Sequence, residues 1–305
     1  MQLEGIHHIT AITGDAQRNL DFYAGTLGLR LVKKTVNQDD PSVYHLFYAD
    51  EEGTPGADLT FFEYPGAAPG HAGAGMVHRI VWRVASGEAV GFWEERLSGH
   101  GVAAERRDGA LHFADPEGLD HELRVVSTDD APLTAEHPEV PAEMALQGFD
   151  EARAYAADPG ASHRLLADAL GFAHGPQEWE VRGENRGGRW VYDSPPEQPG
   201  RAGGGTVHHI AWASGMDDHE EWRRRVREAG GRPTEVIDRF WFRSIYFREP
   251  SGVLFEIATL GPGFTADEPL EQLGEKLVLP PRFEPDRERI EAQLTPIRNP
   301  RSAIR

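Results

Sequence analysis

Three local patterns in the first half of the chain return in the same order in the second half. A helix that ends at a glycine and leads into a strand is expected at residues 20–31 ("LDFYAGTLGLRL") and again at 163–174 ("HRLLADALGFAH"). An alternating strand, "VHRIVWRV" at 77–84, returns as "VHHIAWAS" at 207–214. Because a repeat on this scale decides the architecture, the two halves are expected to fold alike.

The third pattern is a hairpin in which two strands flank a Pro-x-Gly turn. It is written "FADPEGLDHEL" at 113–123 and "FREPSGVLFEI" at 247–257. Each half would leave an open, mostly antiparallel sheet with an apolar face that needs a partner, and the other half can supply one. The sequence therefore predicts an α+β protein of two similar halves that share a core.

The repeat also divides the chain. We expect a first module at 1–140 and a second module at 141–263. The segment 264–305 belongs to neither repeat. Its stretch "RERIEAQL" is typical of a short helix, which we expect to lie on the outside.

Charge and hydropathy exclude several classes of partner. The 50 Asp and Glu residues outnumber the 31 Lys and Arg residues, and the formal net charge of −19 repels phosphate backbones and anionic lipid. Nucleic acid and membrane surfaces are therefore not expected as partners. No apolar run approaches the roughly 20 residues that span a bilayer, and the start "MQLEGIHH" does not resemble a secretory signal. We expect a cytoplasmic protein.

Cysteine is absent, while 14 histidines are present. Disulfides, thiolate nucleophiles and thiolate metal ligands are therefore excluded, and any metal must be held by nitrogen and oxygen.

Two histidine pairs, at 7–8 and 208–209, each stand near the start of an apolar strand. The side chains of a strand alternate between its faces, so only one histidine of each pair can face a common point. Glu256 lies in a segment that otherwise reads as buried strand, where an isolated carboxylate would cost several kcal/mol. His8, His209 and Glu256 together make a candidate metal set of the type suited to iron(II), manganese or zinc.

Each of these residues alone has an ordinary structural explanation, and the repeat is what favours the metal. The positions equivalent to this set elsewhere in the repeat are Arg79, Glu122 and Glu151. An arginine beside two glutamates satisfies those carboxylates without a metal. The sequence thus predicts one metal set and one ion-pair counterpart of it.

At these residues the chain resembles the vicinal oxygen chelate superfamily, which is built of paired βαβββ modules, and within it the extradiol-type dioxygenases that cleave hydroquinone rings. The resemblance covers most of the chain and is strongest in "GIHHITAITGDAQRNLDFYAGTLGLRLVKKTVNQDDPSVYHLFYAD", "VHHIAW", "FREPSGVLFEIAT" and the tail "LVLPPRFEPDRERIEAQLTPI". It implies iron(II), with manganese(II) as an alternative, held by His8, His209 and Glu256. It also implies a small aromatic substrate and O2 as reactants.

The resemblance extends to residues around the metal. It implies substrate contacts for His7 and Thr10, although alternation turns His7 away from the face that carries Thr10. Arg239 would stabilise negative charge on the substrate, and Tyr246 would hydrogen-bond a substrate oxygen. His208 would transfer protons, since a histidine exchanges protons near neutral pH.

Two other functions stay open from the sequence. A glyoxalase-like isomerase or lyase surrounds its metal with four protein ligands, and Asp58 in "ADLTFFEY" is the candidate for the fourth. A drug-sequestering binding protein needs no metal, so the retained ligand set argues against it. The duplicated chain can complete its site alone, and exposed sheet edges would still permit a homo-oligomer.

Overall fold

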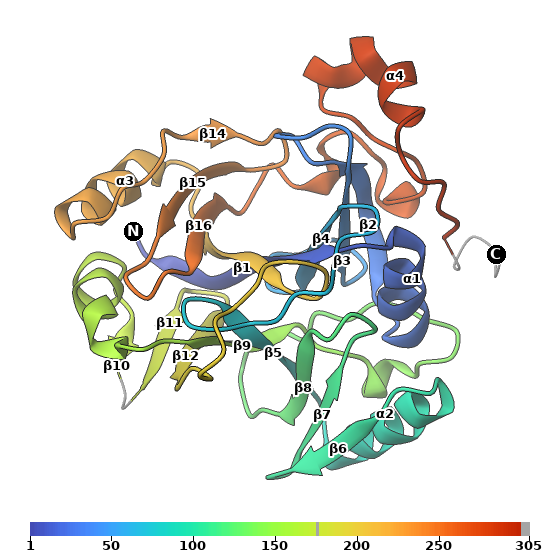
Figure 1. Cartoon of the computed structure of the whole chain (residues 1–305), viewed down its shortest axis with the longest axis horizontal. Helices are drawn as coiled ribbons and strands as arrows, with labels where there is room; N and C mark the ends of the chain where they lie inside the picture. The colour runs from blue at the N-terminus through green and yellow to red at the C-terminus, as the bar shows by residue number, and fades with distance from the viewer. Residues whose placement is uncertain (175–176, 300–305) are drawn as a thin grey trace.

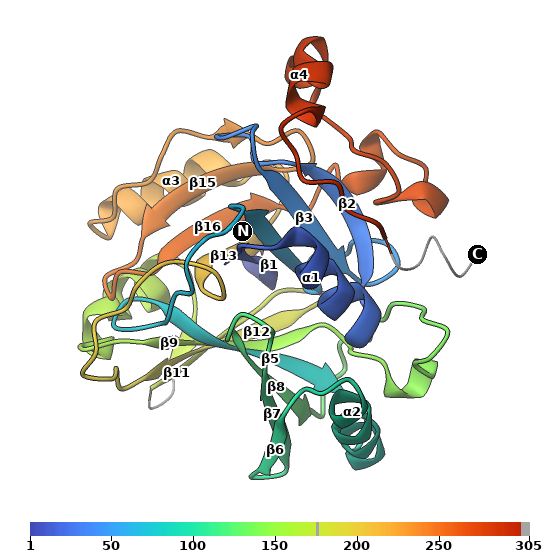
Figure 2. The same cartoon turned by 45° about the vertical axis from the view of Figure 1, so that its right-hand side comes forward.

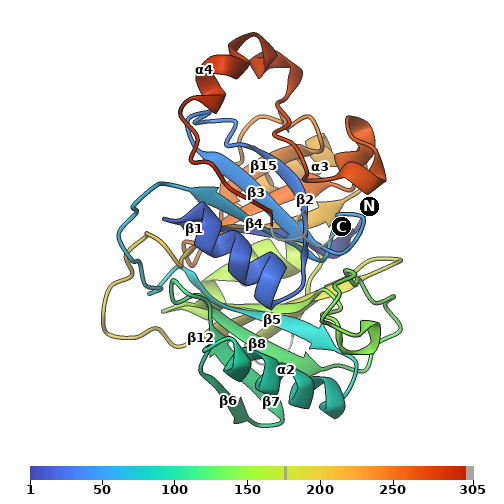
Figure 3. The same cartoon turned by 90° about the vertical axis from the view of Figure 1, so that its right-hand side faces the viewer.

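The computed structural model describes residues 1–174 and 177–299, and these form two eight-stranded sheets, one lying above the other in Figure 3. In spatial order the first sheet consists of β14 (Ile237–Asp238), β15 (Arg243–Arg248), β16 (Leu254–Thr259), β13 (Val207–Ser214), β1 (Leu3–Thr13), β4 (Asp58–Glu63), β3 (Tyr44–Ala49) and β2 (Arg30–Val36). The second sheet consists of β10 (Ala173–His174), β11 (Glu178–Arg182), β12 (Gly187–Asp193), β9 (Phe149–Tyr155), β5 (Val77–Val84), β8 (Asp120–Val125), β7 (Ala110–Ala114) and β6 (Ala104–Arg107).

Each sheet combines strands from both halves of the chain. At the centre of the first sheet β1 pairs antiparallel with β13, and at the centre of the second β5 pairs antiparallel with β9. In the first sheet β1 pairs parallel with β4, and β13 pairs parallel with β16, so each parallel pair joins the first and last strands of one repeated unit. Most other neighbouring strands are antiparallel. The predicted α+β fold of paired βαβββ modules is confirmed. A division near residue 140 separates repeat units but not sheets, because the first and last units share one sheet (Figure 1).

The helices follow the repeat. They are α1 (Ala16–Leu20), which continues as the π-helix η1 (Asp21–Thr26), α2 (Gly87–Gly99), η2 (Ala142–Met144), η3 (Pro159–Ser162), the π-helix η4 (Arg164–Ala169) and α3 (His219–Glu228). Gly28 after η1 and Gly171 after η4 have φ values of +72° and +78°, a conformation that glycine adopts without steric cost. The repeated helix–glycine–strand pattern is therefore confirmed.

The repeated hairpins are confirmed in the same way. Gly118 lies between β7 and β8, and Gly252 lies between β15 and β16, both with positive φ. The main hydrophobic core joins both sheets and includes the tryptophans of the two repeated helices, Trp93 and Trp222. Both side chains are buried, so each of these helices packs one tryptophan into the shared core.

The C-terminal segment covers the outer edge of the first sheet (Figure 2). It contains η5 (Phe264–Ala266), η6 (Leu270–Gln272), η7 (Pro281–Asp286) and α4 (Arg287–Glu291), the last of these within the expected short helix. Its backbone continues the sheet, because the Val278 N–H donates to the Lys34 carbonyl of β2 at 2.9 Å. The ammonium group of Lys33, which is fully buried, contacts Asp267 at 3.0 Å and also pairs with Glu268. The segment thus caps an edge strand that would otherwise expose unpaired backbone groups.

No helix among residues 1–174 and 177–299 is long and apolar enough to cross a membrane.

The second sheet carries the expected ion-pair counterpart of the metal set. Arg79 contacts Glu122 at 3.4 Å, as its place in the repeat predicts. Arg124 bridges the two carboxylates, at 2.5 Å from Glu122 and 3.3 Å from Glu151. Arg153 and Arg189 also lie against Glu151. Both carboxylates are buried, and the guanidinium groups beside them balance their negative charge.

We expect the substitution Arg124→Met to lower the free energy of unfolding by about 2 kcal/mol. This is less than the ~3–5 kcal/mol for breaking an isolated buried pair, because other arginines remain beside Glu151. Urea denaturation measures it. The matched control is Arg106→Met, which removes an exposed pair with Glu94 and should cost less than about 1 kcal/mol. Equal losses in the two variants would show that Arg124 has no special structural role.

Candidate metal centre

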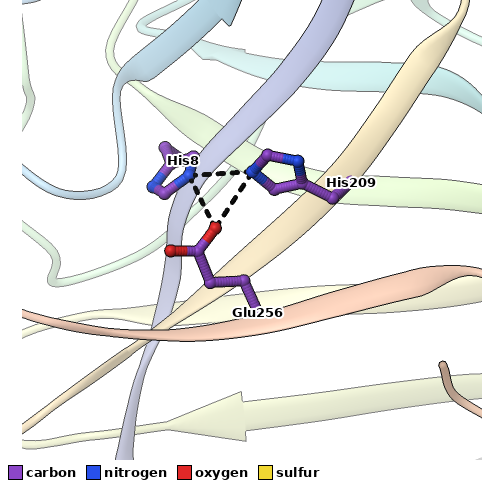
Figure 4. A group of neighbouring side chains, drawn as sticks. All are labelled: His8, His209 and Glu256. Carbon is purple, nitrogen blue, oxygen red and sulfur yellow. Dashed lines mark hydrogen bonds and ion pairs between the residues drawn. The ribbon is translucent and has the colours of Figure 1, made fainter. Parts of the chain in front are cut away.

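The three predicted ligands come together at the centre of the first sheet (Figure 4). His8 projects from β1, His209 from β13 and Glu256 from β16, three adjacent strands. The Nε2 atoms of His8 and His209 are 3.2 Å apart, and they lie 3.2 and 3.0 Å from Oε2 of Glu256. All three side chains are buried. Sheet pairing therefore brings His8 to two ligands that lie more than 200 positions later in the sequence.

This donor set fits a divalent metal. Oε2 of Glu256 is buried and has no hydrogen-bond donor among the described residues, although two imidazole nitrogens face it. The Ser244 hydroxyl donates to the other oxygen, Oε1, and so fixes the carboxylate. Burial opposes ionisation of Glu256, but the neighbouring imidazoles hold its pKa well below the usual range. Burial also lowers the pKa of His209, which keeps that imidazole neutral and able to donate a lone pair.

His7, beside the ligand His8, fixes the tautomer of that ligand. Nε2 of His7 lies 3.0 Å from the Thr259 carbonyl, which can only accept, so the His7 proton is on Nε2. Nδ1 of His7 must then accept from Nδ1 of His8 at 2.9 Å, which turns the lone pair of His8 Nε2 towards the other ligands. Burial, followed by the charge of His8, lowers the pKa of His7 to about 3, so its imidazole stays neutral.

His7 does not line the cavity, and this agrees with the alternation that turns it away from the face of His8. The pairing of β1 with β13 shifts register between Ile6 and His8, which marks a bulge or irregularity. His7 still lies behind His8, where it packs against Phe242. This position suits orientation of a ligand better than contact with a substrate.

The metal set opens onto a cavity of about 530 Å³. The second half of the chain contributes His208, Arg239 and Tyr246 to the lining, as predicted. The first half contributes side chains that the sequence did not single out, namely Asp39, His45, Phe47 and Phe62. The volume is in the range of small-molecule sites, and the lining combines aromatic side chains with many polar ones.

Arg239 and Tyr246 form one polar group of this lining. The Arg239 Nε–H donates to the Tyr246 hydroxyl at 3.2 Å. Its other nitrogens donate to both carboxylate oxygens of Asp39, at 3.0 and 2.9 Å. Burial opposes the charge of Arg239, but Asp39 raises its pKa above the usual value, while burial raises that of Tyr246. The cavity therefore presents a cation and a neutral phenol near the ligand set.

His208 and Thr10 have different relations to the cavity. Nδ1 of His208 lies 2.8 Å from Nδ1 of His209, and partial burial beside His209 lowers the pKa of His208 to about 4. Thr10 is fully buried and does not reach the cavity. Its hydroxyl contacts the Thr60 hydroxyl at 2.7 Å, and Thr60 in turn contacts Nε2 of His45 at 2.9 Å. Thr10 is therefore linked to the cavity only by hydrogen bonds through Thr60 and His45, two residues that the sequence did not single out.

Asp58 does not join the metal set, in contrast to the alternative drawn from the sequence. The pairing of Ala211 with Glu256 in β13 and β16 corresponds to the pairing of Thr10 with Thr60 in β1 and β4. Thr60, not Asp58, thus stands at the position equivalent to Glu256. The Asp58 carboxylate is buried without a hydrogen bond to the described residues, and burial raises its pKa well above the usual range. The isomerase alternative loses its proposed fourth ligand.

We expect Asp58→Asn to leave metal affinity unchanged within about twofold, because the side chain is not a ligand. Glu256→Gln removes the anionic ligand and should weaken the metal by more than the roughly 10- to 100-fold that outer partners of a metal site contribute. Titration of the apo-protein with iron(II) under nitrogen measures both. A large loss of affinity in the Asp58 variant would restore the four-ligand interpretation.

Comparison with known proteins agrees with this geometry. The model of the Glyoxalase/Bleomycin resistance protein/Dioxygenase superfamily matches residues 5–123 and 148–257, which contain all three predicted ligands. The chain belongs to this superfamily. It is 43% identical to a Bacillus subtilis protein provisionally named ring-cleaving dioxygenase MhqO, over 96% of both chains. It is 33% identical to a chlorohydroquinone/hydroquinone 1,2-dioxygenase of Sphingobium indicum, over 93% of both chains.

A solved structure has the same fold. The crystal structure of a B. subtilis protein provisionally named a dioxygenase superposes with a TM-score of 0.90 at 41% identity, over 98% of both chains. The superfamily and the paired-module fold predicted from the sequence are therefore confirmed.

Proposed function

We propose that the protein is an iron(II)-dependent, extradiol-type dioxygenase that opens the ring of hydroquinone-type aromatic compounds with O2. The observation that carries the proposal is the buried cluster of His8, His209 and Glu256 at a cavity that also holds Arg239 and Tyr246. Two neutral imidazoles and one carboxylate suit iron(II), and three protein ligands leave coordination positions for other molecules. The names of the relatives support the same chemistry.

Iron(II), when bound, would supply the redox chemistry that lets triplet O2 react with an aromatic ring. The protein would bind and orient the substrate. Arg239 would attract a substrate oxygen that carries negative charge, and in a dry cavity such a contact contributes a few kcal/mol. Tyr246 stays neutral and would hydrogen-bond the same end of the ring. Asp39 balances the charge of Arg239 in the absence of substrate, so a substrate oxygen would share the guanidinium group with that carboxylate.

His208 is the proposed group for proton transfer. It lines the cavity and contacts His209, and its lowered pKa keeps the imidazole neutral, so it would accept a proton from a substrate hydroxyl near the ligand set. His7 would act as a positioning residue, because its hydrogen bonds hold His8 in one tautomer. Thr10 would act on the substrate side only through Thr60 and His45.

Anaerobic metal reconstitution followed by oxygen uptake tests the proposal. The apo-protein is loaded with iron(II), manganese(II) or zinc(II) in parallel and then given a panel of hydroquinones and catechols. We expect uptake that requires iron(II) and a hydroquinone, with manganese(II) as the only partial substitute. Tight metal binding without oxygen consumption on any ring would refute the dioxygenase.

A further inference from the structure

His45 is a cavity residue whose orientation is fixed on three sides. It projects from β3, in the first half of the chain, and its ring lies 3.9 Å from the ring of Phe47 and 4.4 Å from that of Phe62, between centroids. Nε2 faces the Thr60 hydroxyl at 2.9 Å. The ring of His45 therefore has little freedom to turn, because Phe47, Phe62 and Thr60 contact it.

The hydrogen bonds of two buried threonines determine which nitrogen of His45 carries the proton. Thr10 is fully buried, and its hydroxyl has one partner among the described residues, the Thr60 hydroxyl, so Thr10 must donate to Thr60. Thr60 is equally buried, and its own proton can then go only to Nε2 of His45. Leaving either hydroxyl proton unpaired would cost about 1–3 kcal/mol. Nε2 of His45 is thus an acceptor, and Nδ1 carries the proton.

Nδ1 of His45 has no hydrogen-bond partner in the part of the chain that the structure describes, although the residue lines the cavity. Tyr246 lies on β15, on one side of β1, whereas His45 lies on β3, on the other side. The cavity therefore has polar groups on both flanks of the metal set.

We infer that His45 is a specificity residue, which donates a hydrogen bond from Nδ1 to the ring oxygen of the substrate that lies farther from Tyr246. The inference rests on the proposed function. The two oxygens of a hydroquinone stand at opposite ends of the ring, so a donor on each flank of the cavity matches them. A phenol lacks the second oxygen, and a catechol carries it beside the first. Burial holds the pKa of His45 well below its usual value, so the imidazole stays neutral and keeps this single donor.

The test is anaerobic calorimetry with the iron(II)-loaded protein, in which hydroquinone and phenol are titrated separately. The wild-type protein should bind hydroquinone about 3- to 10-fold more tightly than phenol, the difference expected from one hydrogen bond. In His45→Phe this ratio should fall to about 1, while the affinity for phenol stays within about twofold. His100→Phe, at an exposed site beyond α2, is the matched control and should keep the wild-type ratio.

A second pair of variants protects the test against a folding defect in His45→Phe. Thr60→Val keeps the shape of the side chain but removes the hydroxyl that orients His45, so the hydroquinone preference should fall. Thr60→Ser keeps the hydroxyl and should keep the preference. If hydroquinone is preferred equally in the wild-type protein, His45→Phe and Thr60→Val, the inference is wrong while the dioxygenase stands. If the wild-type protein binds neither ring, the inference and the proposed function both fail.

Discussion

Replacing His209 by alanine is expected to abolish tight metal binding and iron-dependent oxygen uptake together. His209 supplies one of three converging donor atoms, and Nε2 lies 3.0 Å from Oε2 of Glu256. Loss of an outer partner in a metal site costs about 10- to 100-fold in affinity, and loss of a ligand should exceed this. Metal content after dialysis and oxygen consumption with a hydroquinone measure the two effects.

The control for this variant is His100→Ala, because His100 is exposed and does not line the cavity. It should retain wild-type metal content and uptake. Folding of the His209 variant is checked by its urea denaturation in the absence of metal, where it should match the apo-protein within about 1–2 kcal/mol. Wild-type metal affinity in His209→Ala would exclude the proposed centre.

Replacing Arg239 by leucine is expected to lower kcat/KM for hydroquinone by about 100- to 1000-fold while metal content stays unchanged. The magnitude is that of losing one group that stabilises charge in a dry active site. Arg239 lines the cavity but belongs to no ligand set, so metal analysis separates the two roles. Steady-state oxygen uptake measures kcat/KM.

A control variant separates the role of Arg239 from a general effect of positive charge near the cavity. Asp39 binds both terminal nitrogens of Arg239 and is itself largely exposed. The matched control is Arg282→Leu, because Arg282 hydrogen-bonds Gln38 near the cavity without lining it. A change of less than about twofold is expected there. A similar loss in both variants would indicate a general effect of positive charge near the cavity, not a role of Arg239.

The repeat predicted the elements well because its signals are local. Alternating apolar residues mark β5 and β13, and glycines with positive φ end the repeated helices and turns. These features depend on a few neighbouring residues. Which strands pair with one another depends on the whole chain. The alternation within one strand does not predict which other strand will pair with it. The sharing of each sheet between the two halves was therefore not predictable from the pattern.

The candidate site shows the same limit in single residues. Alternation placed His8 and His7 on opposite faces, and His7 does not line the cavity, but the irregularity in β1 leaves no trace in the sequence. The likeness to glyoxalases suggested Asp58, whereas the pairing of β1 with β4 puts Thr60 at the position equivalent to Glu256, since register is a property of two strands. Asp39 and His45 were missed because neither lies in a repeated motif. Their contacts with Arg239 and Thr60 arise only when the sheet closes.

The pairing of β1 with β13 has a consequence for how the chain is made. His8 is translated well before the last ligand, Glu256, which lies in β16, a strand that ends at Thr259. The first sheet cannot be completed until that final unit has left the ribosome, so a nascent chain presents His8 without its partner ligands. Contacts between such distant segments also slow folding. Cleavage between β8 and β9 would leave two fragments that each contribute to both sheets, and the metal would bind tightly only after they reassociate.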